Sequence, residues 1–233
     1  MVTTVRIDER ATALTRARYQ RLSPIYDFME GMAEGRYRPW REKLWTLVKG
    51  PRVLEVGVGT GKNMPYWPKG IQMTAIDLTP GMLEIARRRA QQLGLAADPS
   101  TGFAPAPRSE AKWAGLDLRL GDAQALGFPD ASFDTAVATF VFCSVPDPVL
   151  GLRELARVVR PGGRVLLLEH MRSANPILGA LMDFVNPLVV RLMGANINRQ
   201  TVDNVRAAGL QIESVEDLGM GGIFKLIVAR AGY

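Results

Sequence analysis

Apolar residues along the chain form short runs that are bounded by glycine, proline and charged residues and that alternate with segments of helical periodicity. Seven runs predict strands: residues 52–58, 71–77, 118–120, 133–142, 164–169, 211–215 and 224–229. Three segments between them predict helices: residues 79–94, 148–160 and 199–208. The nearly pure aliphatic character of several runs is typical of strands covered on both faces. The pattern therefore predicts an α/β fold with a doubly wound, seven-stranded and mostly parallel sheet.

The N-terminal fifth of the chain differs from the rest because it contains no strand-like run. Residues 10–49 have a helical pattern, and Pro24 predicts a break between a first short helix and a second helix that ends at Gly50. We expect residues 1–50 to form a basic helical cover and residues 51–233 to form the main domain, together as one structural unit.

Two later stretches depart from the alternation. Residues 95–115 lack periodicity and are rich in proline, alanine, glycine and serine, which predicts an exposed, mobile insertion. Residues 176–193 are strongly apolar but are interrupted by Asp183, Pro187 and Arg191. They allow three interpretations: core helices that cap the sheet, the wall of a hydrophobic acceptor tunnel, or an interfacial patch. The first two are favoured over membrane insertion.

Composition indicates a globular chain, with 47% hydrophobic and 22% charged residues. The single cysteine, Cys143, cannot form an intramolecular disulfide and lies in an apolar run that predicts a buried strand. The N-terminus has no apolar stretch of the kind that a secretory signal needs, and no run is long enough for a spanning helix. These features favour a cytoplasmic protein.

The net charge of +6 makes anionic partners plausible, and residues 1–50 hold ten basic against six acidic residues. An anionic membrane surface fits this bias, although a solvated helix face explains it equally well. Nucleic acid is disfavoured because the chain lacks the Asn/Asp-Pro-Pro-aromatic signature and an added binding domain. We expect a monomer and no metal site.

The segment VLEVGVGTG, residues 53–61, follows a predicted strand and is expected to open a helix that Pro65 and Pro68 break. Gly57, Gly59 and Gly61 allow a sharp turn and a close approach of the backbone to a ligand. Nicotinamide and flavin enzymes use a related turn, and a purely structural loop is a further alternative. The glycines alone therefore do not identify the ligand.

Three acidic residues narrow the choice of ligand for this loop. Asp77 ends the next strand, where a carboxylate accepts hydrogen bonds from both ribose hydroxyls. Asp122 follows the third strand and is placed to reach an adenine edge together with Ala123. Glu55 lies within the first motif, where its alternative role is to order the glycine loop. These acids disfavour a pyrophosphate and suit a cofactor with a positive sulfonium.

The segments VLEVGVGTG, AIDLTPGMLE, GDAQALGFPDASFDTAVATF and LARVVRPGGRVLLLEH resemble the successive motifs of class I methyltransferases. The resemblance covers roughly residues 10–232 and implies the Rossmann-like fold of that class. It also implies that the cofactor is S-adenosylmethionine and the product S-adenosylhomocysteine. The segments RYQRLSPIYDFMEG, FVFCSVPDP and LLLEHMRS are similar to bacterial phosphatidylethanolamine N-methyltransferases, and similar blocks occur in quinone-ring C-methyltransferases and in a group of membrane-associated thiol methyltransferases.

The resemblance implies that the glycines line the methionine part of the cofactor, that Asp77 binds the ribose and that residues 139–142 border the methyl group. The implied cofactor-binding residues are Tyr19, Glu55, Gly57, Gly59, Gly61, Asp77, Leu78, Met82, Asp122, Ala123 and Thr139.

The sequence identifies residues that contact the methyl acceptor less specifically than those that bind the cofactor. Tyr26 is expected to close over the cofactor and face the acceptor, with simple packing as the alternative. His170, the only histidine, could take a proton from an amine, bind a phosphate when charged, or only shape its loop. Candidate phosphate contacts, with surface salt bridges as the alternative, are Arg172, Asn198, Arg199 and Lys225.

The leading hypothesis is a peripheral enzyme that N-methylates phosphatidylethanolamine towards phosphatidylcholine. The alternative enzyme is a C- or O-methyltransferase of a quinone or another hydrophobic small molecule. A cofactor-binding regulator without activity is a third alternative.

Overall fold

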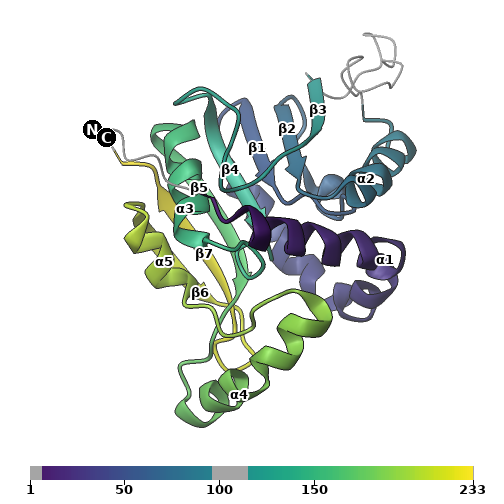
Figure 1. The fold of residues 1–233 in the computed structure, drawn as a ribbon. Helices are drawn as coiled ribbons and strands as arrows, with labels where there is room; N and C mark the ends of the chain where they lie inside the picture. The colour runs from purple at the N-terminus through teal and green to yellow at the C-terminus, as the bar shows by residue number, and fades with distance from the viewer. Residues whose placement is uncertain (1–6, 96–114, 233) are drawn as a thin grey trace.

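The computed structural model describes residues 7–95 and 115–232 and contains one seven-stranded sheet, in the order β3-β2-β1-β4-β5-β7-β6 (Figure 1). Strands β1 to β5 run parallel, and β7 lies antiparallel between β5 and β6. The predicted doubly wound, mostly parallel sheet is therefore confirmed. The strands are β1 (Arg52–Val56), β2 (Gln72–Asp77), β3 (Gly115–Leu120), β4 (Phe133–Thr139), β5 (Val159–His170), β6 (Gln211–Asp217) and β7 (Phe224–Arg230).

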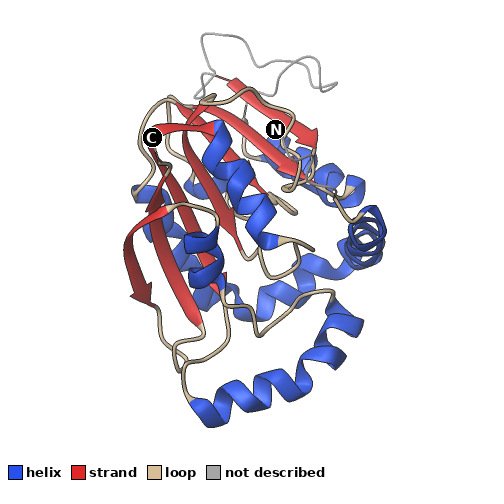
Figure 2. Cartoon of the chain, turned by 60° about the vertical axis from the view of Figure 1, so that its left-hand side comes forward, coloured by secondary structure: helices blue, strands red, loops and turns tan. Residues whose placement is uncertain are grey.

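Helices cover both faces of the sheet (Figures 1 and 2). Alternate residues of β1 show the division: Leu54 belongs to one buried cluster and Val53 to another. The first cluster includes residues of α3 (Pro148–Val158) and α5 (Thr201–Ala207), and the second includes residues of α2 (Pro80–Gln92) and of the end of α1 (Glu9–Thr46). The helices are α1 (Glu9–Thr46), the short 3₁₀ helix η1 (Met64–Tyr66), α2 (Pro80–Gln92), α3 (Pro148–Val158), α4 (Pro176–Met193) and α5 (Thr201–Ala207).

The predicted break at Pro24 is wrong, because α1 is one helix of 38 residues with Pro24 and Pro39 inside it. Proline has no N–H, so Pro24 cannot donate to the carbonyl of Gln20 four residues earlier. The hydroxyl of Ser23 donates to that carbonyl instead, at 3.0 Å. The helix nevertheless changes direction, as Figure 1 shows at its right-hand end, and its second half returns towards β1.

The fourth strand is shorter than predicted. β4 ends at Thr139, and Phe140 adopts a left-handed φ of 57°, which turns the chain out of the sheet. The prediction of a strand up to Phe142 is therefore wrong, and Cys143 is buried in the turn that follows rather than in a strand. Apart from residues 95 and 115, the predicted mobile insertion lies outside the described residues.

Helix α4 stands away from the sheet in both views (Figures 1 and 2). Only Gly179 and Met182 are buried among its residues, so the interpretation as a core cap is wrong. A segment of this hydropathy is compatible with a core helix and with an exposed helix, and only its packing in the structure distinguishes the two. Within residues 7–95 and 115–232, α4 is the one helix long and apolar enough to cross a membrane, and 11% of it is buried.

Candidate active site

The loop after β1 is shaped by two glycines with left-handed backbones. Gly57 has a φ of 69°, and a Cβ there would lie 2.4 Å from a methyl carbon of Val141. Gly59 has a φ of 55°, and a Cβ there would meet no atom within 4 Å. The first glycine is thus required for packing against the chain that leaves β4, and the second borders open space.

This open space is a pocket, here named the polar pocket, between the first half of α1 and the carboxyl ends of β1, β2 and β4. It contains most of the residues predicted to bind the cofactor, together with the predicted catalytic Tyr26: Tyr19, Tyr26, Gly57, Gly59, Asp77, Leu78, Met82, Asp122, Ala123 and Thr139. The site therefore lies at the edge of the sheet where ligands bind in doubly wound folds.

Asp77 is held rigidly at the centre of the polar pocket. Its two carboxylate oxygens accept hydrogen bonds from the backbone N–H groups of Gly59 at 2.9 Å and Thr79 at 2.8 Å. Burial raises its pKa, whereas these hydrogen bonds lower it. The carboxylate also lines the pocket, which places it to accept hydrogen bonds from ribose hydroxyls.

The second acid, Asp122, accepts a hydrogen bond from the backbone N–H of Gln124 at 2.8 Å and borders the same pocket. No lysine or arginine lies among the described residues that line this pocket. Two carboxylates without a cation are unsuited to a pyrophosphate and fit a cationic adenosyl cofactor.

Glu55 and Gly61 were predicted to bind the cofactor, but neither lines the polar pocket. The buried carboxylate of Glu55 accepts hydrogen bonds from Asn63 Nδ2 and Trp67 Nε1, both at 2.7 Å, and burial raises its pKa to about 7. Gly61 leaves room for the side chain of Met64. Both residues therefore order the glycine loop without lining the polar pocket. For Glu55 this is the alternative role given in the sequence analysis.

A second pocket, here named the apolar pocket, adjoins the first. Tyr19, Tyr26 and Phe140 border both pockets. The rest of its lining comes from α1, from residues after β4 and α4, and from the ends of β5 and β7: Leu22, Met29, Glu30, Met32, Ala33, Tyr37, Cys143, His170, Met193, Ala195 and Phe224. A donor in the polar pocket and an acceptor in the apolar pocket would meet at the three shared rings.

Of the two predicted catalytic residues, Tyr26 borders both pockets, and His170 lines the apolar pocket with its ring centroid 6.2 Å from that of Phe140. The phenol of Tyr26 donates to Glu30 Oε1 at 3.0 Å, and burial raises its pKa well above the ordinary value, so it stays protonated. Burial lowers the pKa of His170 to about 4, so its imidazole is neutral near pH 7. A charged His170 that binds phosphate is therefore disfavoured, whereas a neutral one can accept a proton or a hydrogen bond.

The four predicted phosphate contacts do not line either pocket. Arg172 pairs with Asp183 of α4 at 2.9 Å, and Asn198 Nδ2 donates to the same carboxylate at 3.0 Å. Arg199 donates to the carbonyl of Val145, and Lys225 lies 3.7 Å from Asp217. The structure thus places them in protein contacts near α4, α5 and the β6–β7 turn, and the expectation that they surround the acceptor is corrected.

Several lining residues were missed by the sequence reasoning. Phe140 and Val141 are not among them, because residues 139–142 were expected to border the methyl group, but residues 144–146 after the same strand end were missed, and their position after a strand was the available signal. Thr15, Glu30 and Tyr37 come from α1, whose path over the pockets depends on its bend and on tertiary contacts. No local pattern in the sequence indicated them.

Comparison with known proteins agrees with this geometry. The family model described as "Methyltransferase domain" matches residues 54–167. The phosphatidylethanolamine N-methyltransferase of Cereibacter sphaeroides is 36% identical over 209 residues, which cover 87% of this chain and 91% of that protein. The chain belongs to the S-adenosylmethionine-dependent methyltransferases. It is an enzyme of the class I fold.

A further relative is named for a different acceptor, and a solved structure shares the fold. A ubiquinone/menaquinone biosynthesis C-methyltransferase of Rhodopseudomonas palustris is 32% identical over 219 residues, or 89% of this chain and 78% of that protein. The structure of a geranyl diphosphate methyltransferase in complex with S-adenosylmethionine has the same fold, with a TM-score of 0.63 and 17% identity over 83% of this chain and 84% of that chain. The methyltransferase uses S-adenosylmethionine, and the polar pocket fits it.

Proposed function

We propose that this methyltransferase N-methylates phosphatidylethanolamine towards phosphatidylcholine at a membrane surface. The observation that carries the proposal is the junction of the two pockets, where Tyr19, Tyr26 and Phe140 separate a polar site from an apolar one. An acceptor with a long apolar part suits the second pocket. The similarity to the phosphatidylethanolamine enzyme of Cereibacter sphaeroides supports an amine as the methylated group.

When bound, S-adenosylmethionine supplies a methyl carbon that forms a bond to the acceptor nitrogen as its bond to sulfur breaks, leaving a neutral thioether. The chain's own part is to align the two groups and exclude water, which the rings of Tyr19 and Phe140 do at the junction. The amine must release a proton before it attacks. We assign its hydrogen-bonding partners to the phenol of Tyr26 at the junction and to the neutral imidazole of His170 in the apolar pocket.

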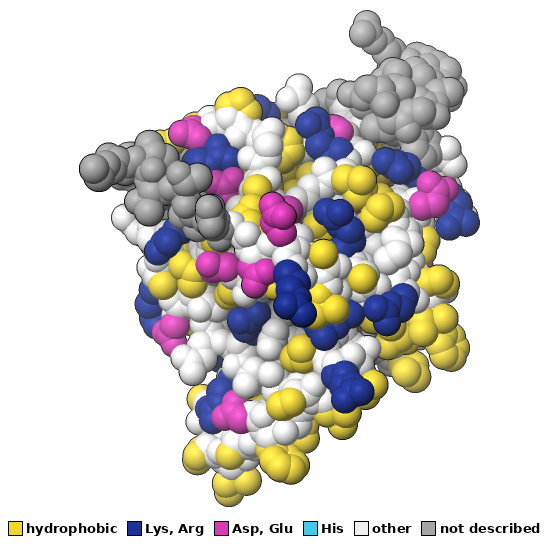
Figure 3. Space-filling model, viewed as in Figure 1, with side chains coloured by type: hydrophobic (Ala, Val, Ile, Leu, Met, Phe, Trp, Pro, Cys, Tyr) yellow, Lys and Arg dark blue, Asp and Glu magenta, His cyan; other side chains and the backbone are white. Residues whose placement is uncertain are grey.

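Access from a membrane is supported by an apolar stripe on α4. Ile177, Leu181, Phe184, Leu188 and Leu192 recur at helical spacing on one face and are exposed, with Phe184 at 84%. They account for hydrophobic surface at the lower edge of Figure 3. A helix with such a face lies in the interfacial plane of a bilayer.

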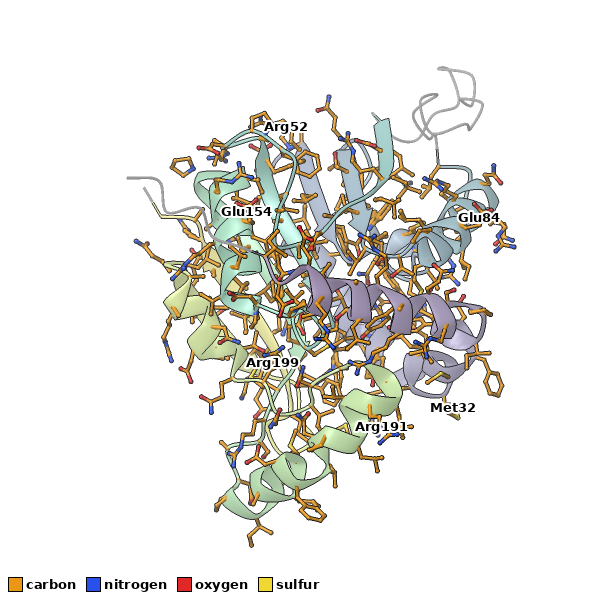
Figure 4. All side chains as sticks on the ribbon, in the orientation of Figure 1. Met32, Arg52, Glu84, Glu154, Arg191 and Arg199 are labelled. Atoms are coloured by element: carbon orange, nitrogen blue, oxygen red, sulfur yellow. The ribbon has the colours of Figure 1, made fainter. Side chains whose placement is uncertain are left out.

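The stripe is continuous with the mouth of the apolar pocket. Met32 of α1 and Met193 of α4 line the pocket and are also exposed, at 84% and 46%. Figure 4 shows Met32 and Arg191 projecting outward on the same side of the molecule. We infer that acyl chains reach the pocket directly from the bilayer and that exposed arginines such as Arg191 contact anionic head groups.

The test is methyl transfer from labelled S-adenosylmethionine to vesicles of phosphatidylethanolamine, with and without anionic lipid, followed by chromatography. Labelled mono-, di- or trimethylated lipid is expected, with faster transfer on anionic vesicles. No lipid product, despite cofactor binding measured on the same preparation, would overturn the proposal.

A quinone acceptor is the second candidate. The rings of Tyr37 and Phe140, with centroids 4.9 Å apart, offer aromatic surface on which a planar ring can stack. The similarity to the enzyme of Rhodopseudomonas palustris supports the same assignment. Vesicles that carry demethylmenaquinone in place of phosphatidylethanolamine test it, since labelled quinone would then be the product.

A further inference from the structure

One charged side chain stands out in the apolar pocket. Glu30 is the only acid among the described residues that line it, and no lysine or arginine lines it. The Glu30 side chain is 17% exposed, and burial raises its pKa, although Arg41 and the Tyr26 hydroxyl lower it. Its Oε1 accepts from the Tyr26 hydroxyl at 3.0 Å and its Oε2 lies 3.6 Å from Arg41, and the side chain borders a cavity whose other lining groups carry no charge near pH 7.

Aromatic rings form the wall of the same pocket. The ring centroids of Tyr37 and Phe140 lie 4.9 Å apart, those of Tyr37 and Phe224 5.7 Å, and those of Phe140 and Phe224 5.9 Å. Aromatic groups of this kind attract methylated ammonium cations, because the ring faces carry partial negative charge and the methyl groups need no hydrogen-bond acceptors.

We propose that the apolar pocket contains an ammonium-binding site, in which Glu30 and the rings of Tyr37, Phe140 and Phe224 hold the cationic nitrogen of the acceptor and of its methylated products. The inference rests on the proposed function in one respect, because it takes the acceptor to be an amine. It goes further than the proposed function by assigning the residues that favour a positively charged nitrogen over an uncharged group of the same shape.

The neighbouring charges leave Glu30 available. Arg41 is 4% exposed, does not line the pocket, and is shared between Glu30 and Glu34 at 3.6 Å each while it donates to Asn63. Lys62 pairs with Asp27 and Glu34. His170 is neutral near pH 7 and does not repel a cation. A cation in the pocket would therefore find Glu30 as its nearest charged group.

The experiment compares two soluble probes that differ in one atom. Dihexanoylphosphatidylcholine carries a quaternary nitrogen, and the 3,3-dimethylbutyl ester of dihexanoylphosphatidic acid carries carbon at the same position. Both are titrated below their micelle concentrations into the full chain saturated with S-adenosylhomocysteine, and calorimetry gives the dissociation constants. We expect the charged probe to bind about tenfold more tightly.

Two variants and a matched control locate the site. Glu30→Gln and Phe224→Leu should each reduce the preference to about threefold or less, because each removes one source of attraction for the cation. Glu34→Gln removes the same charge one helical turn away, next to the same Arg41, but from a residue that does not line the pocket, so the preference should persist. In Glu30→Gln, Arg41 keeps Glu34 and Asn63 as partners, which favours a folded variant.

Equal affinity of the wild type for the two probes, binding of neither, or an equal loss in Glu34→Gln would each overturn the ammonium site, and the wild-type comparison needs no variant to fold. Methylation of phosphatidylethanolamine together with equal probe affinities would remove this site and leave the proposed function standing. A charge preference without methylation of phosphatidylethanolamine would support the site and move the acceptor to a different amine.

Discussion

Arg89 of α2 lies 2.6 Å from the carboxylate of Asp27 in α1, and Thr60 of the glycine loop donates to the same carboxylate at 2.6 Å. Asp27 thus joins the covering helix, the loop after β1 and α2. We expect this contact to hold the covering helix in place over the polar pocket.

Asp27→Asn should weaken cofactor binding. The variant loses the ion pair to Arg89, and because both side chains are partly exposed we expect a loss of about 1 kcal/mol, or about fivefold in the dissociation constant of S-adenosylmethionine. Calorimetry measures this dissociation constant. Glu84→Gln, in an exposed pair with Arg88 on the same helix α2, is the control and should bind normally.

Asp77→Asn should have a larger effect on the same dissociation constant. An amide in this position presents one N–H₂ group to Gly59 or Thr79, whose N–H groups then lose an acceptor, and it also loses one acceptor for the ribose. We expect a loss of about 2 kcal/mol, or about thirtyfold in affinity. Asp117→Asn on β3, which pairs with Arg119 at the surface, should bind the cofactor as the wild type does. Unchanged binding in Asp77→Asn would remove Asp77 from the site.

Glu169 makes stability depend on pH. Its Oε1 accepts from the N–H groups of Val141 and Phe142, its Oε2 has no partner, and burial raises its pKa to about 7 from an ordinary value of 4.5. Between pH 4.5 and 7 the folded state therefore holds a proton that the unfolded chain has released, so the free energy of unfolding falls as pH rises through this window.

Glu169→Gln should remove this contribution, because glutamine resembles the protonated acid and still accepts the two backbone hydrogen bonds. Urea unfolding at pH 5 and pH 8 should show a difference in unfolding free energy about 2 kcal/mol smaller in the variant than in the wild type. In the variant, Glu55, whose pKa is also raised to about 7, still lowers the unfolding free energy as pH rises. His170, whose pKa is lowered from 6.5 to about 4, raises it up to about pH 6.5, so these two contributions oppose each other. Identical slopes in the two proteins would show that Glu169 is ionised throughout.

The pH profile of catalysis should not show the titration of an ordinary histidine at His170. Burial lowers its pKa to about 4, so the imidazole stays neutral from pH 6 to pH 8, and the profile of kcat/KM should show no inflection near 6.5. His170→Asn should lower kcat about tenfold, with a profile parallel to that of the wild type, if the imidazole accepts the proton or a hydrogen bond. A wild-type inflection near 6.5 that is absent from His170→Asn would contradict the buried, neutral imidazole.

The α4 stripe should determine binding to vesicles. Phe184→Glu replaces a side chain that is 84% exposed and apolar by a charge, and we expect at least a tenfold loss in partitioning to anionic vesicles, since burying an aromatic side chain contributes about 2 kcal/mol. Sedimentation with vesicles measures the partitioning. Leu93→Glu makes the same kind of change at an exposed residue at the end of α2 and should partition normally. Methylation of a short-chain soluble lipid should be unchanged in both variants.

The sheet and the polar pocket were predictable because their signals are local. Strand ends, the spacing of Gly57 and Gly59, and the acids Asp77 and Asp122 all lie where a parallel sheet brings its carboxyl ends together. The apolar pocket was not predictable to the same extent. Glu30 and Phe224 are 194 residues apart, and only the bend of α1 and the position of β7 bring them to one cavity.

Two errors have the same physical origin. The exposure of α4 and the pairing of Arg172 with Asp183 both depend on where α4 lies relative to the sheet, and hydropathy carries no information on that position. The error at Pro24 has a different origin: α1 continues through this residue, and the hydroxyl of Ser23 donates to the carbonyl that proline leaves free. Such compensation is visible in coordinates but not in a residue pattern.

The covering helix has a kinetic consequence. Tyr19 and Tyr26 of α1 border both pockets, and they are less than two turns apart on an unbroken helix. A displacement of this segment that releases S-adenosylhomocysteine would therefore also open the acceptor pocket. If the acceptor is methylated more than once, as in the proposed conversion of phosphatidylethanolamine to phosphatidylcholine, release of the spent cofactor and escape of a partly methylated product would compete. The time for which the acceptor is retained would then set how many methyl groups are added in a single encounter.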